Sequence, residues 1–206
     1  MRFMSLNKAS LKEWNLYAII DRQAVGERNL LDAARGAIAG GAEVIQLRDK
    51  ISHAQRVIRD AHDIKKLCGR HKVCFLINDR VDIACSVDAD GVHLGQEDIP
   101  VEEARKILGP KKIIGKSTHS IEQALFAQTQ DVDYIGIGPV YQTPTKPDYQ
   151  AVGLELVRWA KEHVRIPFVA IGGINRDTID AVVEAGADVL AVVRALCAQR
   201  DVEAAT

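Results

Sequence analysis

The sequence predicts an α/β fold, a single (β/α)8 TIM barrel that occupies residues 1–206. Eight short, β-branched apolar runs alternate along the chain with longer amphipathic stretches. The runs are continuously apolar, which is typical of parallel strands buried on both faces. A short segment that ends a helix and precedes a strand recurs three times, as Gly-Gly-Ala-Glu, Asp-Ala-Asp-Gly and Ala-Gly-Ala-Asp. An open doubly wound sheet is the alternative. The eight successive units, with no dinucleotide fingerprint after the first run, favour closure.

The expected strands are the apolar runs themselves. In chain order they are Leu16–Ile20, Glu43–Leu47, Val73–Ile77, Gly91–Leu94, Ile113–Gly115, Tyr134–Ile137, Pro167–Ile171 and Val189–Val193. Capping residues and glycine stops predict the helices between them. Asn29 caps the first helix, which ends at Gly40-Gly41, and Ser52, Ser120 and Asn175 are N-cap candidates for later ones. The expected helices are Asn29–Ala39, Ser52–Gly69, Val81–Ser86, Pro100–Gly109, Ser120–Gln128, Leu154–Glu162 and Asn175–Ala185, with a last one from about Ala195.

Charge and length exclude several classes of protein. The 206 residues include 27 basic and 28 acidic ones, for a formal net charge of −1. Because the net charge is close to zero, no strong overall electrostatic field indicates a nucleic acid or membrane partner. Any affinity for anions must come from a local cluster of charged residues. No apolar run approaches the roughly 20 residues that span a bilayer.

The start of the chain and the cysteines indicate a cytoplasmic protein. Residues 1–14 lack the apolar centre of a signal peptide, and we interpret them as a polar lead-in or short helix that closes the bottom of the barrel. The four cysteines form no C-x-x-C pair and fit no zinc pattern. They are interpreted as buried or incidental thiols in a reducing compartment.

Polar residues gather at the predicted C-terminal strand ends, where such barrels place their chemistry. Arg48 and Lys50 lie one strand period of two apart, so both side chains can meet one anion. Asp79 and Asp98 follow neighbouring strands and can share Mg²⁺, which prefers one or two protein carboxylates plus water and phosphate oxygens. The alternatives are a solvated charged turn and two helix caps. With Lys146 nearby, the expected ligand is a diphosphate.

A proline-rich loop and a glycine pair complete the predicted mouth. Prolines restrict the backbone of residues 139–147, so Thr143, Thr145 and Lys146 are preset for contacts with oxyanions, although a rigid loop without a ligand is the alternative. Gly172-Gly173 follows the seventh predicted strand, where barrels often bind phosphate. Of the two histidines near strand ends, His93 is interpreted as structural and His119 is left open as an acid–base group.

Seven motifs occur in order between Tyr17 and Leu196. They are Gln46-Leu47-Arg48-Asp49-Lys50, Ile77-Asn78-Asp79-Arg80-Val81-Asp82, Asp90-Gly91-Val92-His93-Leu94-Gly95-Gln96-Glu97-Asp98, Gly115-Lys116-Ser117-Thr118-His119-Ser120, Tyr134-Ile135-Gly136-Ile137-Gly138-Pro139-Val140, Thr143-Pro144-Thr145-Lys146 and Ala170-Ile171-Gly172-Gly173-Ile174. Together they resemble the thiamine-phosphate synthase family. The Asn-Asp-Arg, Gln-Glu-Asp and Thr-x-Thr-Lys elements carry most of the resemblance.

The resemblance implies a transferase that joins hydroxymethylpyrimidine diphosphate to hydroxyethylthiazole phosphate, or to its carboxylated form, and releases pyrophosphate. In the family the C–O bond breaks first, and the thiazole nitrogen captures the resulting pyrimidine cation. This chemistry needs stabilisation of the leaving-group charge more than a strong protein base. The implied partners are small phosphorylated molecules, and the implied cofactor is one Mg²⁺ per site. A homo-oligomer is compatible with the sequence.

The resemblance also implies a role for each matching residue. The metal ligands are Asp79 and Asp98, and the catalytic residues, which also bind substrate, are Arg48, Ser117 and Lys146. The other substrate-binding residues are Gln46, Asp49, Lys50, Asn78, Thr143, Thr145, Gly172, Gly173, Val193 and Arg194. Of these, the threonines would contact the thiazole, while Gly173 and the end of the eighth strand would hold its phosphate.

One departure and two rival functions accompany the resemblance. Arg194 stands where family members often carry serine, so the role of its side chain is left open. Its backbone amide can still contribute to the phosphate cradle, the predicted phosphate site formed by Gly172-Gly173 and the end of the eighth strand. A thiazole tautomerase-like homologue is compatible with His119, but it breaks no diphosphate bond and does not need the metal set. A non-catalytic phosphate-ligand sensor would need the cradle without Asp79 and Asp98.

Overall fold

Eight parallel strands close into a barrel within the part of the chain that the computed structural model describes, namely residue 11, residues 13–146 and residues 149–206. The strands are β1 (Leu16–Asp21), β2 (Val44–Arg48), β3 (Cys74–Asn78), β4 (Gly91–Leu94), β5 (Ile113–Thr118), β6 (Tyr134–Ile137), β7 (Phe168–Ile171) and β8 (Leu190–Val192). Their order around the barrel is their order in the chain, and β8 closes on β1. The predicted (β/α)8 TIM barrel is confirmed.

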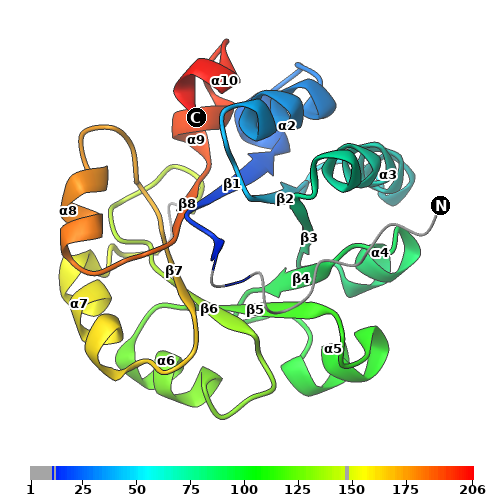
Figure 1. The fold of residues 1–206 in the computed structure, drawn as a ribbon. Helices are drawn as coiled ribbons and strands as arrows, with labels where there is room; N and C mark the ends of the chain where they lie inside the picture. Colours follow the sequence, from blue (N-terminus) through cyan, green and yellow to red (C-terminus); the bar gives the residue numbers. More distant parts are fainter. Residues whose placement is uncertain (1–10, 12, 147–148) are drawn as a thin grey trace.

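Helices surround the strands on the outside of the barrel (Figure 1). They are α1 (Arg22–Val25), α2 (Leu30–Ala39), α3 (Ala54–His71), α4 (Val81–Ser86), α5 (Val101–Leu108), α6 (Ile121–Ala127), α7 (Gly153–His163), α8 (Ile179–Glu184), α9 (Arg194–Cys197) and α10 (Val202–Ala205). The short helix α1 was not predicted, and α10 lies beside α2 (Figure 1). Among the described residues, no helix has the length and apolar character needed to cross a membrane.

Two of the four predicted N-caps are wrong. Asn29 and Ser120 do cap α2 and α6, because each side chain accepts a hydrogen bond from a backbone N–H in the first turn. Ser52 instead lies in the turn before α3, which begins after His53 without a side-chain cap. Asn175 precedes a separate turn, and α8 begins only after Thr178. Both errors shorten a predicted helix at its start and leave the barrel unchanged.

Apolar side chains form two layers, because successive residues of a strand point to opposite faces of the sheet. In β1, Tyr17 and Ile19 belong to the layer inside the barrel, and their neighbours pack against the helices. Trp14 closes the inner layer from below, with its ring edge-on to Tyr17 and Tyr134 at centroid distances of 5.9 and 5.6 Å. Residues 1–10 and 12, which belong to the predicted lead-in, lie outside the described part.

The same alternation decides which side chains reach the barrel mouth. Val44 of β2 belongs to the inner layer, so Gln46 and Arg48 point inward as well. In β5, which is longer than predicted, Ile113 belongs to the inner layer. Ser117 therefore shares its inward direction. The polar residues at the ends of β2 and β5 thus enter the space above the apolar interior.

Candidate active site

A cavity of about 670 Å³ opens at the C-terminal end of the barrel. Its volume lies within the roughly 300–1,000 Å³ of typical small-molecule sites. Every strand contributes a residue from its own length or from the loop that follows it. The predicted site residues that line the cavity are Gln46, Arg48, Lys50, Asn78, Asp79, Asp98, Ser117, Thr143, Thr145, Lys146, Gly172, Gly173, Val193 and Arg194.

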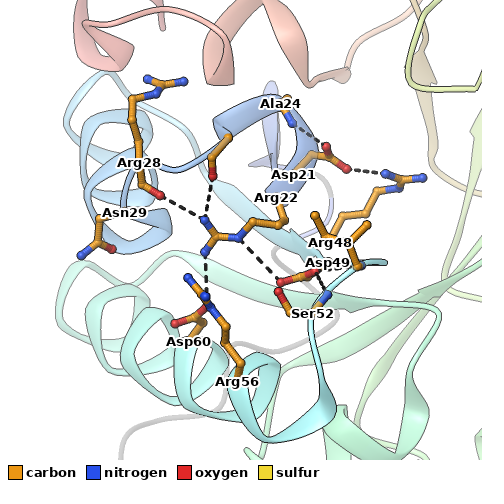
Figure 2. A network of polar contacts seen from close by, with 12 residues as sticks. Asp21, Arg22, Ala24, Arg28, Asn29, Arg48, Asp49, Ser52, Arg56 and Asp60 are labelled. Atoms are coloured by element: carbon orange, nitrogen blue, oxygen red, sulfur yellow. Dashed lines mark hydrogen bonds and ion pairs between the residues drawn. The ribbon is translucent and has the colours of Figure 1, made fainter.

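Asp49 is the exception, and the structure contradicts its predicted substrate-binding role. Its side chain is 0% exposed, and its carboxylate accepts hydrogen bonds from the backbone N–H groups of Ile51 and Ser52, at 3.1 and 2.9 Å. Arg22 Nε lies 3.7 Å from the same carboxylate (Figure 2). The reason is strand alternation: residues on either side of Asp49 face the cavity, so Asp49 faces outward. It shapes the turn that carries Lys50.

The carboxyl groups of Asp79 and Asp98 meet at one side of the cavity, within hydrogen-bonding contact of each other. The ammonium of Lys50 lies 2.9 Å from Asp79 Oδ2. Burial raises the pKa of Asp79 most, and the adjacent Asp98 raises it further. Asp79 has a φ of 60°, a left-handed conformation that Asp tolerates better than most residues. Two carboxyl groups in contact require a proton or a cation between them.

A neighbouring strand anchors the loop that carries Asp98. The backbone N–H of Gly95 donates to Asp98 Oδ2 at 2.6 Å, and the carbonyl of Gly95 accepts from the Lys116 ammonium at 2.7 Å. Lys116 is buried, and burial lowers its pKa. The strand β5 therefore fixes the position of one member of the acidic pair.

Cationic side chains surround the acidic pair. Arg48 is buried, and its guanidinium donates to the carboxylate of Asp21 at the end of β1. The ammonium of Lys146 lies 5.1 Å from the centroid of the Tyr149 ring, and burial lowers its pKa. Together with Lys50, these groups provide three positive charges on the cavity wall. Such a cluster is suited to a polyanion.

A chain of hydrogen bonds crosses the barrel interior beneath the cavity. His93 contacts Ser117 Oγ through Nε2 and Tyr134 Oη through Nδ1, each at 2.9 Å. The hydroxyls of Tyr134 and Tyr17 are 3.0 Å apart, and Gln46 donates to the hydroxyl of Tyr17. Burial lowers the pKa of His93 to about 3, so its imidazole is neutral at neutral pH. The chain fixes Gln46 and Ser117 and agrees with a structural role for His93.

His119 presents a different environment at the cavity wall. Its Nδ1 donates to the carbonyl of Gly138, and its ring packs against the Tyr149 ring at a tilt of 51°, with centroids 4.5 Å apart. Within the described residues, its buried Nε2 has no hydrogen-bond partner. Burial is the main cause that lowers the pKa of His119. The neutral ring therefore keeps Nε2 as an acceptor.

The glycine pair after β7 allows the backbone to approach the loop after β6. Gly172 and Gly173 have φ values of 102° and 66°, which favour glycine. A Cβ atom on Gly172 would lie 2.5 Å from Pro139, and one on Gly173 would lie 2.5 Å from Tyr141. Both glycines line the cavity beside the end of the neighbouring strand β8, where Arg194 is exposed at the rim. Close packing against Pro139 and Tyr141 explains why glycine is needed at both positions, and the predicted contact with phosphate stays a prediction.

Asp21 is a polar residue beside the site that the sequence analysis missed. It follows the apolar run of β1, as the predicted site residues follow theirs, and this signal was present in the sequence. Only 2% of Asp21 is exposed. Its carboxylate holds the Arg48 guanidinium from the neighbouring position at the end of β1.

A closed (β/α)8 barrel with cations, paired carboxylates and a glycine pair at its mouth is an enzyme scaffold suited to phosphorylated small molecules. The family model of thiamine monophosphate synthase matches residues 16–196, and the chain belongs to that family.

Individual relatives agree with this assignment. The chain is 46% identical over 197 residues to a thiamine-phosphate synthase of Shouchella clausii, covering 95% of this chain and 94% of the relative. It is 44% identical over 198 residues to the Chloroflexus aurantiacus enzyme of the same name, covering 96% and 91%. A solved thiamine phosphate pyrophosphorylase from Pyrococcus furiosus superposes with a TM-score of 0.87 at 40% identity, covering 95% of this chain and 93% of that one.

Proposed function

We propose that this chain is a thiamine-phosphate synthase. It joins hydroxymethylpyrimidine diphosphate to hydroxyethylthiazole phosphate, or to its carboxylated form, and releases pyrophosphate. Membership of the family supports the reaction. The observation that carries the proposal is the contact between Asp79 and Asp98 beside Lys50. A phosphate sensor has no need for such a pair, because bringing two carboxyl groups together is costly.

The cationic side chains stabilise the leaving group. When the C–O bond of the pyrimidine substrate breaks, its bonding electrons go to the diphosphate, whose negative charge increases. Arg48, Lys50 and Lys146 line the wall where this charge develops, and fixed charges at such a position accelerate the reaction. Arg48 is already held by Asp21 before substrate binds.

The acidic pair fits one Mg²⁺. Two carboxylates from neighbouring strand ends match the preference of this ion for one or two protein carboxylates together with phosphate oxygens. Burial, and then the adjacent Asp98, raise the pKa of Asp79, and a divalent cation would stabilise the charged form of the pair. When bound, the ion supplies positive charge to the diphosphate oxygens. Lys116 and Gly95 keep Asp98 in place for this role.

The remaining groups orient the two substrates. The interior hydrogen-bond chain fixes Gln46 and Ser117 as donors or acceptors for the pyrimidine. Thr143 and Thr145, on the loop after β6, line the same cavity and would contact the thiazole, while Gly173 after β7 would contact its phosphate. Correct orientation inside a recessed site replaces the need for a strong base and protects a reactive cation from water.

Turnover of the two purified substrates tests the proposal. We expect thiamine phosphate and pyrophosphate in equal amounts, with a loss of about 10²-fold or more after chelation and recovery on addition of Mg²⁺. Thiazole phosphate binding without turnover would favour a sensor. Isomerisation of the thiazole without any pyrimidine diphosphate would favour a tautomerase. Either result, or turnover that a chelator leaves unchanged, contradicts the proposal.

A further inference from the structure

We propose that Asp21 is a positioning residue that sets the orientation of Arg48 toward the diphosphate; this inference rests on the proposed function. Asp21 is the last residue of β1, and its carboxylate is divided between two donors. Oδ1 accepts from the backbone N–H of Ala24 at 2.9 Å, in the first turn of α1, and Oδ2 accepts from Arg48 Nη1 (Figure 2). The helix therefore fixes the carboxylate, and the carboxylate fixes the guanidinium.

Burial makes this contact specific. The side chains of Asp21 and Arg48 are only 3% and 10% exposed, so little water competes for the contact between them. Arginine has many rotamers, and a buried charge pair restricts them. The planar guanidinium carries further N–H donors in a fixed fork. A diphosphate can therefore bind Arg48 while Asp21 stays in place.

A second set of contacts holds the segment that carries Asp21. The guanidinium of Arg22 donates to the carbonyls of Gly26 and Arg28, each at 3.0 Å. It also lies 3.4 Å from the carboxylate of Asp60 on α3 and 3.7 Å from that of Asp49 (Figure 2). These contacts tie α1 to the turn after β2 and to α3. The backbone next to Asp21 is thus connected to the strand that carries Arg48.

Among the three cations described on the cavity wall, Arg48 is the one that pairs with Asp21. Lys50 pairs with Asp79 at 2.9 Å, and Asp79 belongs to the acidic pair. Occupation of that pair by a cation would free Lys50 for the diphosphate but would leave the contact between Asp21 and Arg48 intact. Arg48 is then the cation whose direction is set before the ligand arrives.

Two variants of Asp21 break the contact in different ways. In Asp21→Asn, the amide has one acceptor for two N–H donors, so one of them faces an NH₂ group. In Asp21→Ser, the hydroxyl can still cap α1 but is too short to reach Arg48. We expect both to lower kcat about 10- to 100-fold, because misplacement of a positioning group costs up to that much. We expect KM for the pyrimidine diphosphate to change less than about threefold.

A double-mutant cycle with Arg48→Ala separates positioning from a structural effect. If Asp21 acts through Arg48, Asp21→Ser lowers kcat less than about twofold in the Arg48→Ala background. Additive losses, or a folded Asp21→Ser with wild-type kcat, would overturn the proposal.

Asp90→Asn is the matched control. Its buried carboxylate also accepts from one backbone N–H and one cation, Phe75 and Lys65, at 2.9 and 2.7 Å, but it precedes β4 at the opposite end of the barrel. Its kcat is expected to stay unchanged.

The same double-mutant cycle can be measured on the affinity for pyrophosphate, which does not depend on turnover. Calorimetric titration with pyrophosphate and Mg²⁺ is expected to show about tenfold weaker binding for Asp21→Ser, and no further loss when Arg48 is already alanine. If the wild type makes no thiamine phosphate, the proposed function fails, and this titration still decides the role of Asp21. If the wild type is active and the cycle is additive, only the inference about Asp21 fails.

Discussion

Asp79→Asn is expected to abolish synthase turnover, with a fall in kcat/KM of about 10³-fold or more, because it removes one carboxylate of the acidic pair and with it the site for the cation. Binding of the thiazole phosphate is expected to survive, since the glycine cradle lies after β7, away from the pair. The measurements are pyrophosphate release with both substrates and titration with thiazole phosphate alone. Unchanged turnover would refute the metal assignment.

The fold of this variant is expected to be intact. Asparagine tolerates the left-handed φ of 60° at this position as aspartate does, and the substitution removes repulsion with Asp98. The pKa of Asp79 is raised by burial and by Asp98. Without metal, the charged form therefore destabilises the folded wild type. The melting temperature of the variant should exceed that of the wild type at pH values above this raised pKa.

The difference in melting temperature between Asp79→Asn and the wild type has a defined pH dependence. It should shrink as the pH falls below the raised pKa of Asp79. It should vanish below the ordinary carboxyl range, where Asp79 is protonated in both folded and unfolded chains. Asp82→Asn is the control for turnover. Asp82 lies on the same segment, is 65% exposed and pairs with Arg80, so its loss should leave both turnover and the metal requirement unchanged.

Lys146→Ala is expected to lower kcat by about 10²- to 10³-fold, with a smaller change in KM, because Lys146 acts mainly on charge that develops as the bond breaks. Burial lowers the pKa of Lys146. The wild type should therefore lose activity as the pH rises through that lowered pKa. This loss should occur at a lower pH than the deprotonation of an exposed lysine.

Arginine at this position tests the same charge. Lys146→Arg keeps its charge at alkaline pH, so whatever activity it retains should not fall over that range. Lys161→Ala is the control, because Lys161 is half exposed on α7 and pairs with Asp188 at 2.9 Å. A Lys146→Ala variant with near-normal kcat, or an alkaline fall that persists in Lys146→Arg, would show that this ammonium does not stabilise the leaving group.

Much of the barrel could be predicted because parallel strands buried on both faces leave a continuous apolar run, as at Tyr134–Ile137. Most of the candidate site followed, since polar residues after such runs face one mouth. The prediction that Asp49 binds substrate does not hold for its side chain, because the alternation that brings Arg48 and Lys50 to the cavity turns Asp49 away from it. The role of Asp21 could not be predicted, because it depends on contacts with Ala24 and Arg48 that form only in the folded barrel.

Contacts between strands could not be foreseen. The interior chain joins Gln46 of β2 to Ser117 of β5 through residues on three other strands, and only closure of the barrel brings them within reach. The direct contact between Asp79 and Asp98 likewise depends on the backbone of two loops. The cytoplasmic location and a homo-oligomeric state stay predictions of the sequence.

Crystals grown with Mn²⁺ and pyrophosphate give the most direct test of the acidic pair as a cation site. Anomalous scattering locates the ion without reference to activity. We expect one ion bound by both Asp79 and Asp98 together with pyrophosphate oxygens, and Arg48 in contact with the pyrophosphate. An ion bound to neither carboxylate, or pyrophosphate seated away from both, would contradict it.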